Sequence, residues 1–145
     1  METQEKKQVT VETIVKAPID KVWEYFTVPE HITRWYFASD DWAAPYADND
    51  LLVDGKFKFR LAAKDHSAGF DFEGRYTKIE KYKLLEYIIG DGRKVMVTFS
   101  EEPDGVRVKE TFDAENENSI ELQRNGWQAI LDNFKKYVEG HEKQQ

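Results

Sequence analysis

The sequence predicts a single α+β domain in which a curved antiparallel sheet packs against a long C-terminal helix. Apolar residues between positions 118 and 138 recur every three or four residues, which places them on one side of a helix. Most of the chain before this helix alternates apolar and polar residues, as half-buried strands do. An amphipathic helix is stable only when its apolar side is covered, so we expect the sheet to cover it.

The predicted C-terminal helix runs from Asn118 to Val138. Large apolar side chains share one of its sides, namely Ile120, Trp127, Ile130, Leu131, Phe134 and Tyr137. Asn118 followed by Glu121 is typical of an N-cap with its reciprocal acid, and Gly140 is typical of a position just past a helix end. Gly126 costs about 1 kcal/mol relative to alanine inside a helix. We attribute it to close packing against the sheet, with room for a ligand as the alternative.

The composition excludes several classes of partner and site. The chain has 145 residues, 21 basic and 28 acidic, and its net charge of −7 argues against nucleic acid or an anionic membrane as a partner. It contains no cysteine, which rules out disulfides, thiolate catalysis and cysteine-ligated metals. No apolar run approaches the ~18 residues that a membrane span requires. We therefore expect a cytoplasmic protein without a membrane span.

One domain is expected at residues 9–139, between a disordered N-terminal tail at 1–8 and a C-terminal tail at 140–145. The alternation in Val9–Lys16 predicts the first strand. Pro18 and Pro29 then begin two short helices.

The acidic stretch at 40–50 contains Pro45, and it is either an irregular loop or an edge strand. After it, alternation and turn residues predict a meander of antiparallel strands. The predicted strands cover 57–61, 70–76, 84–89, 95–99 and 106–113, and the turns are Lys64–Gly69, Gly90–Gly92 and Pro103–Gly105. We expect about six or seven strands in all.

Several short pieces, in this order, resemble one family. They are Ala17-Pro18 with Val22-Trp23, Arg34-Trp35, Gly55 before a Phe-rich strand, Gly74-Arg75-Tyr76, Leu85-Glu86-Tyr87, and Gly126-Trp127 with Leu131 and Phe134. The chain resembles the START-like (SRPBCC) superfamily, and within it the homologues of the activator of the heat-shock protein 90 ATPase. The resemblance implies a helix-grip fold, in which a curved sheet wraps the C-terminal helix around an elongated apolar cavity. The chain departs from the family at Asp54-Gly55, where a Gly-Gly pair is usual.

Strand alternation and the helix side together predict which side chains could line such a cavity. The candidate ligand-binding residues are Trp35, Phe57, Phe59, Phe72, Tyr76, Tyr87, Val97, Phe99, Glu110, Gln123, Trp127 and Leu131. Apolar walls with a few polar groups suit a small-molecule pocket. The alternative is that the same side chains fill a solid core.

Glu110 is the most informative of these residues, because alternation places it on the same side as Val108 and Phe112. A buried carboxylate must be paired, hydrated or protonated. It could accept a hydrogen bond from a ligand hydroxyl or, with a raised pKa, act as an acid or base. The alternatives are a bulge that turns it outward and a salt bridge with Arg124.

We expect a module that binds a small hydrophobic molecule, either aromatic (polyketide- or flavonoid-like) or lipid-like, with no cofactor and no metal. His31, His66 and His141 lack metal-ligand spacing, and no nucleophile elbow, phosphate loop or dinucleotide motif is present, so no catalytic residue is assigned. The resemblance leaves two alternatives. One is a chaperone partner in the manner of heat-shock protein 90 ATPase activators, and the other is a cyclase- or hydrolase-type enzyme using the same cavity.

Overall fold

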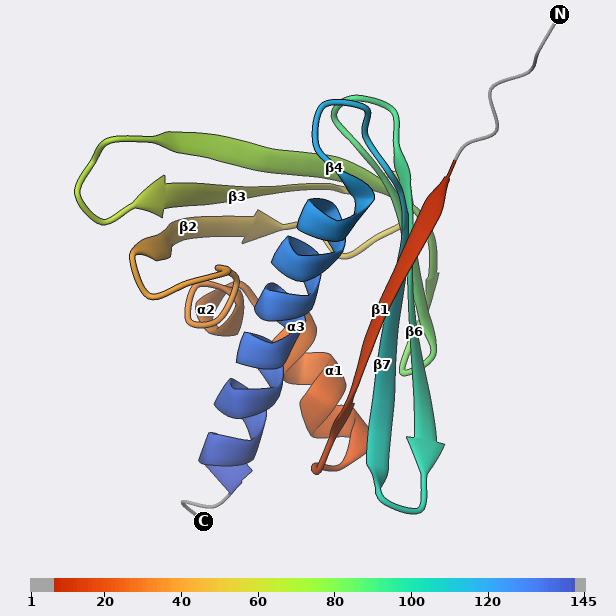
Figure 1. Ribbon diagram of the computed structural model, residues 1–145. Coiled ribbons are helices and arrows are strands. Elements are labelled where there is room, and N and C mark those ends of the chain that lie inside the picture. Colours follow the sequence, from red (N-terminus) through yellow and green to blue (C-terminus); the bar gives the residue numbers. More distant parts are fainter. Residues whose placement is uncertain (1–6, 143–145) are drawn as a thin grey trace, which may run out of the picture.

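A curved antiparallel sheet holds the long C-terminal helix on its concave side (Figure 1). The computed structural model describes residues 7–142. In this range the elements are β1 (Gln8–Val15), α1 (Ile19–Thr27), α2 (Pro29–Ile32), β2 (Trp42–Asn49), β3 (Lys56–Ala63), β4 (Gly69–Glu80), β5 (Leu84–Ile89), β6 (Lys94–Glu102), β7 (Gly105–Asp113) and α3 (Ile120–Glu142). This order confirms the predicted helix-grip α+β fold. Most of the expected N-terminal tail and the end of the expected C-terminal tail lie outside the described residues.

The sheet consists of a meander of six strands and the first strand, which pairs with the last. Over residues 7–142 its seven strands follow the order β1-β7-β6-β5-β4-β3-β2, and all neighbours are antiparallel. β2 to β7 therefore pair in sequence, while β1 lies beside the last strand. This arrangement leaves β1 and β2 as the two edges of the sheet.

The free edge of β1 is covered by side chains of α3. Gln128 Nε2 donates to the backbone oxygen of Glu12 at 3.1 Å, and Lys135 Nζ donates to that of Ile14 at 2.7 Å. Unpaired carbonyls on an edge strand are a template for pairing with another chain. The helix therefore satisfies this edge as well as burying its own apolar side.

The acidic segment at 40–50 forms an edge strand, β2, which was one of the two predicted alternatives. Its pairing with β3 is irregular between Ala43 and Tyr46, around Pro45. Proline has no N–H to donate, so an edge strand with an interrupted ladder accommodates it. The second short helix, α2, ends at Ile32, and Trp35 and Tyr36 lie in the turn that follows.

The ends of α3 differ from the prediction. Ser119 is the N-cap, because its Oγ accepts a hydrogen bond from the backbone N–H of Leu122 at 3.0 Å. Asn118 instead bonds Glu115, whose carboxylate accepts from the Asn118 backbone at 2.6 Å and from its side-chain amide at 3.3 Å. At the other end the helix continues through Gly140 to Glu142, so Gly140 does not end it.

The departure from the usual Gly-Gly pair at Asp54-Gly55 has a backbone explanation. Asp54 has φ of 68°, a left-handed conformation that aspartate adopts more readily than most residues. At Gly55 an added Cβ would lie 2.2 Å from the backbone oxygen of Asp50, so this position requires glycine. Asp54 therefore meets the conformational requirement of the first position, and Gly55 meets the steric requirement of the second.

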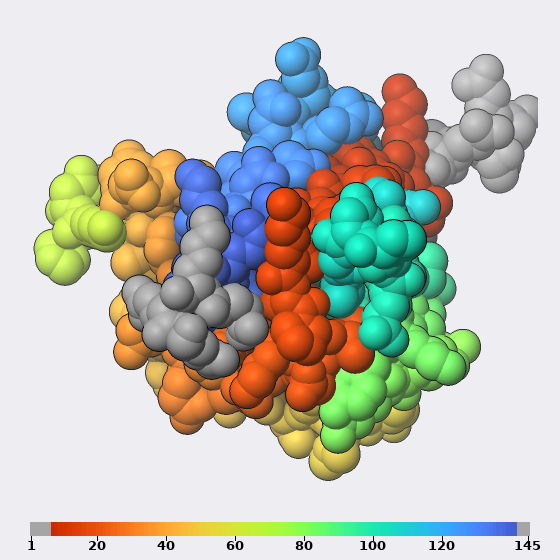
Figure 2. All heavy atoms as spheres, turned by 90° about the horizontal axis from the view of Figure 1, so that it is seen from below, coloured from red at the N-terminus to blue at the C-terminus, as the bar shows by residue number. Residues whose placement is uncertain are grey.

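The core is solid around the middle of α3. The Phe134 ring centroid lies 4.6 Å from that of Trp35 and 5.2 Å from that of Phe26, and Phe26 lies 5.3 Å from Phe99. Below this core, Figure 2 shows the orange-red start of α1 between the dark-blue C-terminal turns of α3 and the teal β6–β7 turn. Aromatic rings therefore fill the interior around Phe134.

The Ser119 cap gives a test of the helix boundary. Replacing Ser119 by alanine removes the acceptor for an otherwise unpaired N–H and should lower the free energy of unfolding by about 1 kcal/mol. Ser119→Asp keeps an acceptor and should retain stability close to the wild type. Chemical denaturation followed by circular dichroism measures both variants. Equal stability of the alanine variant and the wild type would contradict the assigned cap.

Candidate functional site

Aromatic side chains line the part of the concave surface formed by β3, β4 and β5. We call this set the aromatic group, and it consists of Tyr36, Phe57, Phe59, Phe72, Tyr76 and Tyr87. Phe57 lies at its centre, with ring centroids of Phe59 at 5.1 Å and Tyr87 at 5.0 Å. Alternation along the strands places these rings on one side, as predicted.

Tyr36 joins the aromatic group from outside the sheet. Its ring lies 5.1 Å from that of Phe59 and 5.8 Å from that of Phe72. Tyr36 was not among the predicted site residues, although it directly follows the candidate Trp35 in the sequence. The turn after α2 therefore supplies one wall of the site.

Glu110 points inward from the middle of the sheet, as predicted. Its register on β7 is regular, opposite Val11 of β1 and Val97 of β6, so the predicted alternative of a bulge is wrong. The salt bridges described within residues 7–142 do not include Glu110, and Arg124 is exposed. Burial raises the pKa of the Glu110 carboxyl to about 8, so it is mostly protonated at neutral pH.

The tyrosines near Glu110 are also shifted. Burial raises the pKa of Tyr36 and of Tyr87 well above the ordinary value, and the charge of Glu110 raises both further. Burial also raises the pKa of Tyr76, although its hydroxyl donates to Asn49 Oδ1 at 2.6 Å. These hydroxyls therefore remain neutral hydrogen-bonding groups inside an apolar wall.

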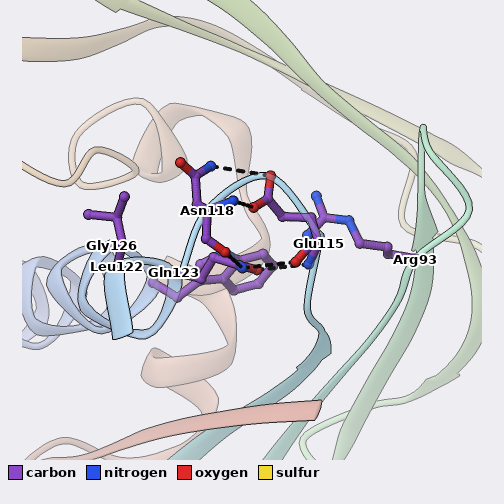
Figure 3. A pocket seen from close by; sticks show the side chains of 7 residues that line it. Arg93, Glu115, Asn118, Leu122, Gln123 and Gly126 are labelled. Carbon is purple, nitrogen blue, oxygen red and sulfur yellow. Dashed lines mark hydrogen bonds between the residues drawn. The ribbon is translucent and has the colours of Figure 1, made fainter. Parts of the chain in front are cut away.

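A cleft of about 230 Å³ lies at the N-terminal end of α3 (Figure 3). It is lined by Arg93, Glu115, Asn118, Leu122, Gln123, Gly126 and Trp127. Arg93 reaches toward Glu115 from the β5–β6 turn, whereas Leu122 points away from the hydrogen-bonded side chains. The cleft thus brings together the β5–β6 turn, the β7–α3 loop and the first turns of α3.

Gln123, one of the candidate ligand-binding residues, lies at this cleft, but its amide is already engaged in hydrogen bonds. Its Nε2 donates to the backbone oxygens of Glu115 at 3.1 Å and Asn118 at 2.8 Å, and its Oε1 accepts from the Glu115 N–H at 2.8 Å. Gln123 therefore fixes the β7–α3 loop that forms one side of the cleft.

Gly126 does not pack closely against the sheet, so that prediction is wrong. No atom lies within 4 Å of the place where its Cβ would be, apart from its own helix and chain neighbours. The residue lines the cleft beside Trp127, whose ring stacks on Phe112 at 3.8 Å with an interplanar angle of 12°. The predicted alternative, room for a ligand, agrees with this open position.

The predicted site residues thus fall into three places. Phe57, Phe59, Phe72, Tyr76 and Tyr87 belong to the aromatic group, and Glu110 lies near it. Gln123 and Trp127 line the cleft. Trp35, Val97, Phe99 and Leu131 are buried in the solid core, where the Trp35 ring N–H donates to the Tyr25 oxygen at 2.9 Å.

Four residues of the cleft were not predicted from the sequence, namely Arg93, Glu115, Asn118 and Leu122. They stand in turns or on the exposed side of a helix, where no periodicity marks them. Over residues 7–142, no group of three His, Cys, Asp or Glu side chains is placed to hold a metal ion. In the same part of the chain, no helix is long and apolar enough to cross a membrane.

A curved antiparallel sheet that grips a C-terminal helix, with short helices after the first strand, defines a helix-grip protein of the START-like (SRPBCC) superfamily, a fold that typically has a ligand-binding cavity. A family model described as "Activator of Hsp90 ATPase homolog 1-like protein" matches residues 16–139, and the chain belongs to that family. None of the curated proteins matches the sequence.

Solved structures support the same assignment. The AHSA1-like protein from Aeromonas hydrophila is 44% identical over 94% of each chain, with a TM-score of 0.89. Chr148 from Cytophaga hutchinsonii is 46% identical over 97% of this chain and 96% of its own, with a TM-score of 0.77. CV1439 from Chromobacterium violaceum is 18% identical over 92% and 98% of the two chains, with a TM-score of 0.82, and shares the fold.

The raised pKa of Glu110 predicts how stability depends on pH. An ordinary glutamate titrates near 4.5, whereas the folded protein releases this proton near 8. Between these values the folded state holds a proton that the unfolded state has lost, so the free energy of unfolding falls as pH rises. Glu110→Gln cannot ionise, and its stability relative to the wild type should increase by up to about 1.4 kcal/mol per pH unit over this range.

Urea denaturation at several pH values between 4.5 and 8 measures this difference. Glu101→Gln is the matched control, because Glu101 is exposed on β6 and should not produce the same trend. If the curves of wild type and Glu110→Gln ran parallel, the Glu110 carboxyl would have an ordinary pKa in the folded protein.

Proposed function

We propose that this protein binds a small hydrophobic molecule between the sheet and α3. The aromatic group supplies the apolar wall, and the cleft at the N-terminal end of α3 is the entrance. Ligands of this class are aromatic, including polyketide- or flavonoid-like compounds, or lipid-like. Burial of apolar area supplies affinity in such sites, and a few polar groups fix orientation.

The observation that carries the proposal is the open position at Gly126. Glycine inside a helix costs about 1 kcal/mol relative to alanine. No atom across from Gly126 requires the missing side chain, since its Cβ position is open. The helix has glycine at this position despite the cost, and the missing side chain leaves space at the cleft beside Trp127. Ligand access is a use of this space that packing does not explain.

A continuous series of rings connects the cleft with the aromatic group. The Trp127 ring centroid lies 6.3 Å from that of Phe72. Phe72 in turn lies 5.7 Å from Phe57 and 5.8 Å from Tyr36. Aromatic rings in edge and offset arrangements present surfaces on which a planar or apolar ligand can pack. A ligand that enters beside Trp127 therefore meets the aromatic group directly.

The size of the cleft also favours a ligand that reaches inward. Pockets for drug-sized ligands usually measure about 300–1,000 Å³. The cleft holds about 230 Å³, which accommodates only part of such a molecule. The backbone of α3 lies closest to β1 and α1, and side chains of the aromatic group bridge the remaining distance toward β4. Rotation of these rings would extend the cleft between helix and sheet.

Amide NMR titration tests the proposal with flavone, progesterone and lauric acid as probes. At least one should cause saturable shifts at Phe72, Gly126 and Trp127. Gly126→Leu fills the open position and should weaken that binding at least tenfold. Gly140→Leu is the matched control, since Gly140 is also in α3 with an open Cβ position but does not line the cleft.

Two outcomes would count against the proposal in different ways. If none of the probes produced saturable shifts, binding of hydrophobic ligands would be refuted for these classes. If a probe bound equally well to the Gly126→Leu and Gly140→Leu variants, the cleft would not be its entrance.

A further inference from the structure

Three polar groups near the aromatic group have no hydrogen-bond partner among residues 7–142. They are the Glu110 carboxyl and the hydroxyls of Tyr36 and Tyr87, in residues that are 5%, 8% and 6% exposed. Other buried groups nearby are paired. Tyr76 donates to Asn49, whose amide donates to the Thr27 oxygen at 2.7 Å. Tyr76 and Asn49 are thus paired, whereas these three groups, which we call the polar trio, are not.

The polar trio is not sealed inside the packing. Within the described part of the chain, Thr77 Oγ1 is the side-chain polar atom that is both fully occluded and without a partner. The oxygens of the trio are not fully occluded, so a water-sized molecule can touch them. A buried polar group without a partner costs about 1–3 kcal/mol, and such groups bond water or a ligand.

The members of the trio face one region of the concave surface. On β7, Glu110 lies opposite Val97 of β6. The next inward residue of β7 is Phe112, which lies opposite Val95 of β6. Val95 in turn pairs with Tyr87 of β5. Glu110 and Tyr87 are therefore in adjacent rows of the sheet. Tyr36 reaches the same region from the turn after α2, and the charge of Glu110 acts on both hydroxyls.

We propose that the polar trio binds a carbonyl oxygen, so that the hydrophobic ligand of this protein is a neutral aromatic ketone or related carbonyl compound. This inference rests on the proposed function. A protonated carboxyl and two phenols each offer an O–H donor, and a carbonyl oxygen, which has two lone pairs and no donor of its own, can accept from two of the three. A pure hydrocarbon would leave all three groups unpaired.

The protonation of Glu110 then controls affinity. Burial raises its pKa to about 8, so at pH 7 the carboxyl can donate to the carbonyl. Above pH 8 the carboxylate has no proton to donate and repels the partial negative charge of the ligand oxygen. Apparent affinity is the intrinsic affinity multiplied by the competent fraction, so it should fall about tenfold between pH 7 and 9.

A pair of probes of the same shape tests this inference. Fluorenone carries a ketone and fluorene replaces it by CH₂, and amide NMR titration measures the dissociation constants of both. At pH 7 fluorenone should bind the wild type at least tenfold more tightly than fluorene. Its affinity should fall about tenfold by pH 9, while that of fluorene should stay constant, because fluorene makes no hydrogen bond.

Variants of the trio separate the hydrogen bond from general packing. Glu110→Gln keeps an N–H donor but cannot ionise, so it should retain the preference for fluorenone and lose the pH dependence. Tyr87→Phe should reduce the preference several-fold. The control is Tyr137→Phe, whose hydroxyl contacts His31 Nδ1 at 2.6 Å between α2 and α3, away from the trio.

Equal binding of fluorenone and fluorene to the wild type would overturn the carbonyl assignment and leave the proposed function standing. A preference that persisted unchanged to pH 9, or in Tyr87→Phe, would also overturn the role of the trio. Failure of both probes together with flavone, progesterone and lauric acid would refute this inference and the proposed function alike.

Discussion

Burial of the apolar side of α3 against the concave surface is the constraint on which the rest of the structure depends. Leu131, Phe134 and Val138 are fully buried, and the sheet must curve to cover them. Curvature gives the two ends of the helix different surroundings. Near Phe134, rings from α1, the turn after α2 and β6 fill the interior. Near Trp127, the sheet contributes long aromatic side chains and the helix contributes a glycine, so space remains.

The contrast between the filled interior near Phe134 and the more open interior near Trp127 explains why polar groups occur on one part of the concave surface. A carboxyl in the solid core would have neither partner nor water, and its cost would be several kcal/mol. Glu110 is instead flanked by Val11 and Val97 within its sheet, and its carboxyl is not fully occluded. The regular strands hold the carboxyl in place, and its surroundings decide its protonation. A site of this kind combines a rigid backbone with a small number of adaptable side chains.

Strand alternation was sufficient to predict the sheet, its inward rings and the direction of Glu110, because a period of two assigns each side chain to one surface. The N-cap could not be predicted in this way. Asn118 and Ser119 are adjacent and equally suited, and the position of Glu115 decides between them. Gly126 was misinterpreted because its meaning depends on what lies across from it. Arg93 and Glu115 meet at the cleft only through the tertiary fold.

The covered edge of β1 has a consequence for how the molecule is made. The residues joined by the Gln128–Glu12 and Lys135–Ile14 hydrogen bonds are 116 and 121 positions apart in the chain. Local hairpins of β2 to β7 can form as soon as they leave the ribosome, whereas the first strand must wait for β7 and then for α3. Contacts of such long sequence separation slow folding. During synthesis β1 therefore stays without its strand partner until β7 has been made.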